Sequence, residues 1–125
     1  MESIKENSDV LSNKFGEMVL LMDRWIENLQ NNKHVTNYFH RKSFQSIAIY
    51  GTSYLAQRLQ TELESTDISI RLIFDKNSID NLVGKEKDLD VIVVTSLYYY
   101  YEIKQKLSKI TTCPIICIDD IIYRI

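Results

Sequence analysis

Apolar residues in the first 30 positions recur at the spacing of an α-helix. Six of these apolar residues follow one another at alternating steps of four and three positions: Leu11, Phe15, Met18, Met22, Trp25 and Leu29. This spacing places them on one face of a helix. A second amphipathic stretch, Val35–Lys42, predicts a shorter helix. Residues 1–43 are therefore expected to form an N-terminal helical segment.

After residue 44 the apolar pattern changes to that of strands alternating with helices. Apolar or alternating runs at 47–50, 68–74, 89–95 and 114–118 predict four strands. Helical spacing at 55–63 and 100–110 predicts helices after the first and third strands. Residues 76–88 are mostly polar and read as a loop, and 121–123 as a short final helical turn.

The alternation of strands and helices predicts an α/β fold. Right-handed crossovers then give a Rossmann-like parallel sheet of four strands, ordered second, first, third, fourth, with helices on both faces. Residues 44–125 would form this Rossmann-like domain, and the helical segment 1–43 would join it as one structural unit. Because the winding reverses between the first and third strands, a ligand is expected at the carboxyl ends of those strands.

The turn after the first strand is the strongest candidate for ligand binding. Gly51-Thr52-Ser53-Tyr54 lies where a dinucleotide-binding G-x-G-x-x-G motif would lie. Gly51 keeps the first glycine, which allows the tight turn, whereas Ser53 and Ala56 replace the second and third. The amino end of the following helix still offers free N–H groups to an anion.

Three polar residues end the neighbouring strands. Asp75 follows Gly51 by 24 residues, close to where an acidic residue would bind ribose hydroxyls. Its alternative role is to begin a loop. Thr95 and Ser96 end the third strand, and Ser96 has the alternative role of capping the next helix. The predicted ligand-binding set is Gly51, Thr52, Ser53, Tyr54, Asp75, Thr95 and Ser96.

Charge and composition exclude several classes of protein. The chain has 125 residues, with 15 Lys and Arg against 17 Asp and Glu, for a net charge of −2. A nucleic-acid binder usually carries a basic surplus, so none is expected here. No apolar run is long enough for a membrane span, and the acidic amino terminus is unlike a signal peptide. We therefore expect a cytoplasmic protein.

The cysteines and histidines do not form a recognisable metal or disulfide pattern. Cys113 and Cys117 flank a predicted strand, which holds them too far apart to pair, so both are expected as free thiols. His34 and His40 are six residues apart and fall on different helix faces. No metal site is predicted.

A run of four tyrosines, 98–101, is the remaining candidate for chemistry. Tyr100 and Lys104 form the Y-x-x-x-K pair that short-chain dehydrogenases and sugar epimerases use as acid/base and pKa-lowering lysine. In those enzymes the pair lies on a later helix, so catalysis by it is the least favoured reading. Four consecutive tyrosines cannot all face inward, and those left exposed would border the crevice. No other catalytic motif is complete, so the chain alone is not expected to be an enzyme.

Several segments together resemble a family. They are 47–51, 59–63, 74–77, 90–95, 102–107 and 114–122, with the Trp25 helix and Asn37-Tyr38-Phe39 before them. In this order they resemble Rossmann-like accessory domains of bacterial capsule and lipopolysaccharide biosynthesis, which are nucleoside-diphosphate-sugar epimerase-like and occur alone or attached to glycosyltransferases. Members commonly have a second glycine where this chain has Ser53.

The resemblance implies a non-catalytic domain that binds a nucleotide, a nucleotide-sugar or NAD(P), with a glycosyltransferase as partner. The alternative is a ligand-free structural or partner-binding module that kept the fold. The apolar stripe of the first helix also predicts a homodimer built on Leu11, Phe15, Met18, Met22 and Trp25. Its alternative is that this helix covers one sheet face of its own chain.

Overall fold

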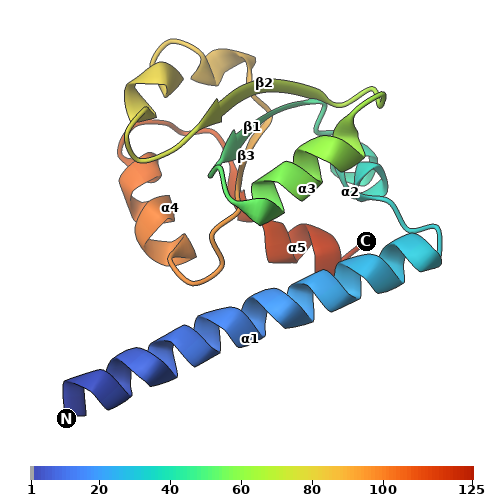
Figure 1. The fold of residues 1–125 in the computed structure, drawn as a ribbon. Helices are drawn as coiled ribbons and strands as arrows, with labels where there is room; N and C mark the ends of the chain where they lie inside the picture. The colour runs from blue at the N-terminus through green and yellow to red at the C-terminus, as the bar shows by residue number, and fades with distance from the viewer. Residues whose placement is uncertain (1) are drawn as a thin grey trace.

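The structure is a computed structural model that describes residues 2–125, with side chains described from Asn13 onward. Figure 1 shows a long N-terminal helix lying beneath a small α/β domain. The elements in chain order are α1 (Glu2–Gln30), α2 (Val35–Lys42), β1 (Ser46–Tyr50), α3 (Tyr54–Leu63), β2 (Ser69–Phe74), η1 (Ile79–Leu82), η2 (Glu86–Asp88), β3 (Val91–Val94), α4 (Tyr100–Ser108), β4 (Ile115–Cys117) and α5 (Ile118–Tyr123).

The four strands form one parallel sheet in the order β2-β1-β3-β4, which confirms the predicted topology. Ile47 pairs with Val91 on one side and Ile70 on the other, and a register shift follows in the β1–β2 pair. The winding reverses between β1 and β3, as predicted. Because of this reversal, the connections that follow β1 and β3 leave the sheet toward opposite faces. Ligands of such sheets bind between the carboxyl ends of the two strands.

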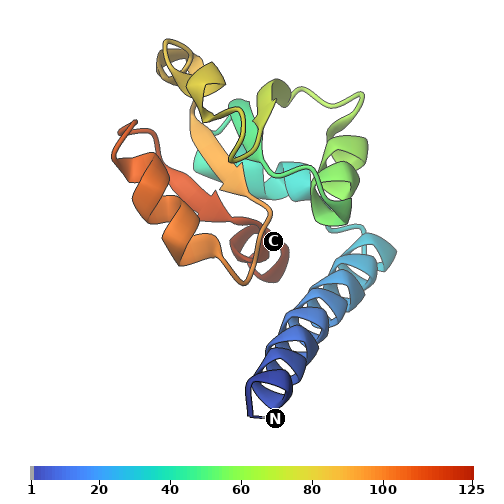
Figure 2. The ribbon, with the colours of Figure 1, turned by 60° about the vertical axis from the view of Figure 1, so that its left-hand side comes forward.

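The alternation of side chains along β1 divides the core into two halves. Ile47 and Ile49 are fully buried on the face covered by α1, α2, α3 and α5, together with Val91 and Val93 of β3. Ala48 and Tyr50 point to the other face, which α4 and η1 cover. Successive strand residues project to opposite faces, so the apolar runs in β1 and β3 supply both layers. Figure 2 shows the helices on either side of the sheet.

The carboxyl-terminal part of α1 packs on its own chain. Leu21 and Trp25 belong to the core, and Asn28 is buried with Nδ2 donating to the carbonyl oxygen of Ile122 at 2.8 Å. Trp25 Nε1 donates to Glu62 Oε1 of α3 at 2.7 Å. The prediction that Trp25 lies on an exposed dimer stripe is therefore wrong, because its side chain is only 5% exposed.

The remaining stripe residues differ from one another. Met18 and Met22 are half-buried and pack against the core, whereas Phe15 is 64% exposed. The side chain of Leu11 lies outside the described part of the structure. The helix thus covers its own chain with one row of residues and leaves an adjacent row uncovered.

The loops and the chain end depart slightly from the predictions. Two short 3-10 helices, η1 and η2, interrupt the loop predicted at 76–88. The final helix begins at Ile118, directly after β4, rather than at Ile121. Cys113 and Cys117 are both free thiols, as predicted. Within the described residues, none of the helices combines the length and the apolar character that a membrane crossing requires.

Candidate functional site

A crevice of about 480 Å³ opens at the carboxyl ends of β1 and β3. Six of the seven predicted residues line it: Gly51, Thr52, Ser53, Asp75, Thr95 and Ser96. Tyr54 does not line it, and its side chain is 70% exposed. The sheet reversal therefore brings together residues that lie up to 45 positions apart in sequence.

Gly51 shapes the floor of the crevice. Its φ of +121° is a conformation that residues with a side chain rarely adopt. A Cβ at this position would lie only 2.1 Å from Thr95 Oγ1. Gly51 N donates to the carbonyl oxygen of Phe74 at 2.8 Å, so the turn is also tied to β2. The glycine thus allows the β1 turn and the end of β3 to lie in direct contact.

The amino end of α3 opens into the crevice without a side-chain cap. Ser53 is the N-cap residue, and its hydroxyl makes no capping hydrogen bond. The first turn carries no acidic residue. The first backbone N–H groups of a helix have no partner within the helix, and the helix dipole adds positive potential there. These amides are available to an anionic group.

Thr95 and Ser96 line the crevice in different ways. Thr95 is 2% exposed, and its hydroxyl donates to the carbonyl oxygen of Tyr50 at 2.9 Å. That hydroxyl therefore holds the β1 turn against β3. Ser96 is half-buried and does not cap α4, whose N-cap residue is Tyr99. The alternative role of Ser96 as a helix cap is thus wrong.

Asp75 begins the loop after β2, which is the alternative role that the sequence predicted for it. Its Oδ1 accepts hydrogen bonds from Asn77 N at 2.8 Å and from Ser78 Oγ at 3.2 Å. The carboxylate nevertheless borders the crevice. Burial, and after it the Asp75 charge, raise the pKa of Tyr50, which keeps that phenol neutral.

Sequence reasoning missed the wall that α1 contributes. Lys14 and Met18 line the crevice, although they precede the sheet by about 30 residues or more. Lys14 Nζ lies 2.5 Å from Tyr99 Oη and 4.3 Å from the centre of the Tyr99 ring. The available signal was spacing, because Lys14 and Met18 continue the helix face of Leu21 and Trp25. Lys76 adds a second cationic residue at the rim.

The tyrosine run divides as the sequence predicted, except that Tyr101, which is 77% exposed, does not border the crevice. Tyr98 and Tyr99 line the crevice and are each a little over 40% exposed, with their rings in an edge-to-face contact. Tyr100 lies outside the crevice, and its hydroxyl donates to the carbonyl oxygen of Ile115 at 3.0 Å. Burial raises the pKa of Tyr100, the opposite of what a tyrosinate acid/base requires. Lys104 lies 5.9 Å from the centre of this ring. The geometry therefore does not favour catalysis by this pair.

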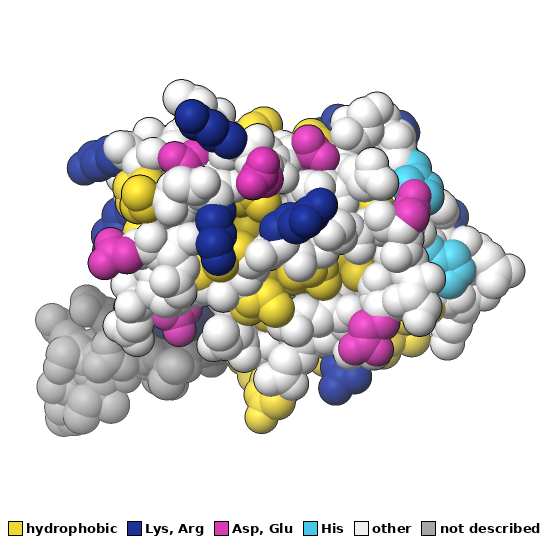
Figure 3. Space-filling view, turned by 90° about the horizontal axis from the view of Figure 1, so that it is seen from above, with side chains coloured by type: hydrophobic (Ala, Val, Ile, Leu, Met, Phe, Trp, Pro, Cys, Tyr) yellow, Lys and Arg dark blue, Asp and Glu magenta, His cyan; other side chains and the backbone are white. Residues whose placement is uncertain are grey.

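The cysteines and surface charges favour no further chemistry. Burial raises the pKa of Cys117 to about 12 and also raises that of Cys113, so both thiols stay protonated. In the described part of the chain, no three His, Cys, Asp or Glu side chains gather as metal ligands would. Figure 3 shows basic and acidic side chains interspersed on the face it presents. That face lacks the one-signed basic surface that nucleic-acid binding uses.

Comparison of the chain with protein-family descriptions, curated proteins and solved structures gave no match.

Proposed function

We propose that the crevice binds a nucleotide or a nucleotide-sugar and that the chain is a non-catalytic binding domain. The observation that carries the proposal is the uncapped amino end of α3 facing a crevice that Lys14 and Lys76 border. Backbone N–H groups, a helix dipole and lysine ammonium groups are the partners that phosphate oxygens take in proteins. The exposed rings of Tyr98 and Tyr99 supply a surface on which a base or sugar can stack.

The biological setting rests on the family resemblance alone. The resemblance to accessory domains of capsule and lipopolysaccharide synthesis suggests that the ligand belongs to surface polysaccharide assembly and that a glycosyltransferase is the partner. Ser53 in place of a second glycine keeps a pyrophosphate farther from the backbone than an intact motif would. Nucleoside-diphosphate-sugars and NAD(P) both carry a pyrophosphate, so this substitution acts on both alike, and it is the family resemblance that favours a nucleotide-sugar.

A ligand-free module remains the second candidate, because one observation favours it. Two polar groups predicted to bind ligand, the Thr95 hydroxyl and the Asp75 carboxylate, already make hydrogen bonds within the chain. A crevice whose polar groups are satisfied internally has less to gain from a ligand. Thermal unfolding in the presence of candidate ligands separates the two candidates.

The test is thermal unfolding in the presence of UDP-glucose, a CDP-sugar, NAD⁺, NADP⁺ and CoA. A ligand at 100 times its Kd adds about 2.7 kcal/mol, which for a domain of this size raises Tm by about 10 °C. We expect such a shift with a nucleotide-sugar. No shift with any of the five would leave the ligand-free module as the better account.

Ser53→Asp is the decisive variant. Its carboxylate would cap α3 and occupy the place of a phosphate, so it should abolish the ligand shift while stabilising the free protein by about 0.5 kcal/mol. Loss of binding could then not be ascribed to unfolding. Gln57→Glu is the matched control, because it adds the same charge to α3 at an exposed position outside the crevice. It should keep the ligand shift.

A further inference from the structure

Helix α1 carries an outer apolar row that its own domain does not cover. Its exposed members are Phe15, Val19, Ile26 and Leu29, and the half-buried Met22, which also contacts the core, completes the alternating steps of four and three. Phe15 is 64%, Val19 46%, Ile26 54% and Leu29 42% exposed. A continuous exposed row of large apolar residues marks an interaction surface.

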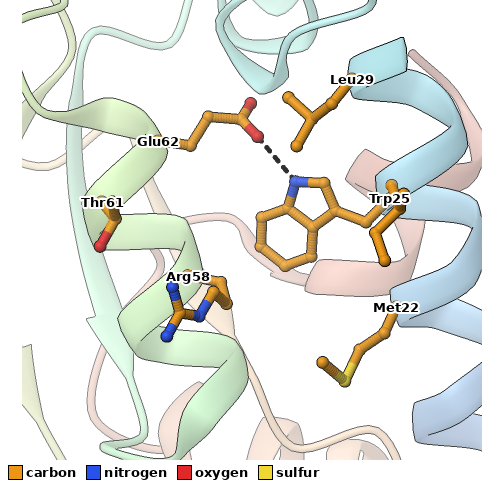
Figure 4. Close-up of a pocket in the computed structure, with 7 residues that line it drawn as sticks. Met22, Trp25, Leu29, Arg58, Thr61 and Glu62 are labelled. Atoms are coloured by element: carbon orange, nitrogen blue, oxygen red, sulfur yellow. Dashed lines mark hydrogen bonds between the residues drawn. The ribbon is translucent and has the colours of Figure 1, made fainter.

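A groove beside this row extends the apolar surface. It has a volume of about 350 Å³ and lies between α1 and α3 (Figure 4), lined by Met22, Trp25, Ile26, Leu29, Arg58, Thr61 and Glu62. The Glu62 carboxylate is already satisfied, because it accepts hydrogen bonds from Trp25 Nε1 and from Val35 N at 2.6 Å. What remains open in the groove is mainly apolar, so the occupant must bring apolar side chains.

The spacing of the row identifies the occupant as a helix. Steps of four and three keep a row straight along a neighbouring helix that crosses at about 20°. Helix α1 has 29 residues, whereas α2 to α5 have six to ten. In a second copy, α1 offers the same row at the same length. A two-fold axis would then cover both rows with one interface.

Charges on the two flanks of the row favour a parallel arrangement. Asp23 borders the row on the flank opposite Trp25, and Arg58 of α3 borders the groove on the Trp25 side. Both are exposed, and neither forms an ion pair with any residue whose side chain is described. When two helices pair in parallel, the Trp25 side of one meets the Asp23 side of the other. When they pair antiparallel, the two Trp25 sides meet each other, and so do the two Asp23 sides. Only the parallel arrangement brings Asp23 to Arg58.

We propose that a second copy of this chain docks along the outer row, with the two α1 helices parallel. Apolar side chains of each row enter the groove of the other copy, and Asp23 faces Arg58 of the partner subunit. The interface does not include the crevice at the ends of β1 and β3. The proposal is thus independent of the function assigned to that crevice.

Sedimentation velocity of the full chain, from about 1 to 200 μM, tests the interface. The wild type should shift from monomer to dimer over this range. Ile26→Glu should raise the dimer Kd at least about 100-fold. Leu20→Glu is the matched control, because Leu20 is 66% exposed on the same helix but lies on a different face. It should leave the Kd within about two-fold, and circular dichroism should show that all variants are folded.

Charge exchange tests the orientation and the identity of the partner. Asp23→Arg alone and Arg58→Asp alone should each raise the Kd about 10-fold, and the double variant should restore it. A mixture of the two single variants should form a mixed dimer in preference to either homodimer. A monomeric wild type at every concentration, or a Leu20→Glu variant as impaired as Ile26→Glu, would overturn the proposal. Failure of the double variant to restore the Kd would overturn the parallel arrangement.

Discussion

Replacing Gly51 by alanine tests how the β1 turn shapes the crevice. Two independent costs arise at this position. The backbone must keep a φ of +121° with a side chain present, and the new Cβ would meet Thr95 Oγ1 at 2.1 Å. The Thr95 side chain would have to rotate away from the carbonyl oxygen of Tyr50, to which its hydroxyl now donates at 2.9 Å.

The expected magnitude follows from these two costs. Holding alanine in this sparsely populated conformation costs about 1–3 kcal/mol. Leaving the buried Thr95 hydroxyl without its partner costs about 1–3 kcal/mol more. Gly51→Ala should therefore lower the free energy of unfolding by about 2–6 kcal/mol. That loss is a large part of the roughly 5–15 kcal/mol that stabilises an ordinary domain.

Urea unfolding at pH 7 measures the loss, and two further variants separate its causes. Gly84 also has a positive φ, of +84°, but no atom lies within 4 Å of its would-be Cβ. Gly84→Ala should therefore show the backbone cost alone, about 1 kcal/mol. In a Thr95→Ala background, Gly51→Ala should cost about 2 kcal/mol less than in the wild type. Equal losses for the two glycines, or the same Gly51→Ala loss with and without the Thr95 hydroxyl, would refute the reasoning.

Three further predictions concern other parts of the chain. Gly16→Ala, inside α1 with open space around it, should raise the free energy of unfolding by about 0.5–1 kcal/mol in urea denaturation. Asp90 accepts hydrogen bonds from Ser46 N and Gln45 N, which lower its pKa below the ordinary 3.8. Because the folded-state pKa is depressed, this contribution is present above about pH 4 and is lost as pH falls through the folded-state value. Since the carboxylate is exposed and solvent screens it, Asp90→Asn should cost at most about 1 kcal/mol at pH 7, and progressively less as the pH is lowered below about 4 in the same assay. Burial raises the pKa of the Cys117 thiol to about 12. This thiol should therefore react with a disulfide reagent at pH 8 at least about 100-fold more slowly than free cysteine. A rate near that of free cysteine would contradict its burial.

The sheet could be predicted because its signals are local. Continuous apolar runs such as Val91–Val94 and the alternation of apolar residues along β2 depend only on neighbouring residues. Strand order then follows from the handedness of the crossovers. The position of the crevice follows from the strand order, which is why Gly51 and Thr95 could be placed together from sequence.

The role of α1 could not be predicted in the same way. Its orientation depends on contacts such as Asn28 with the carbonyl of Ile122, which lie 94 residues apart. Nothing near Lys14 in the sequence shows that it reaches Tyr99. The spacing of the apolar residues therefore predicts a single face, whereas the structure divides them into an inner row that includes Trp25 and an outer row that includes Phe15.

The most direct test of the proposed function is a titration of the ¹⁵N-labelled chain with UDP-glucose, followed by amide chemical shifts. We expect saturable shifts that are largest at the amides of residues 52–55, with smaller ones at Thr95 and Ser96, and none of them in the Ser53→Asp variant. Shifts confined to the α1–α3 groove, or no shifts up to about 1 mM ligand, would contradict binding at the amino end of α3.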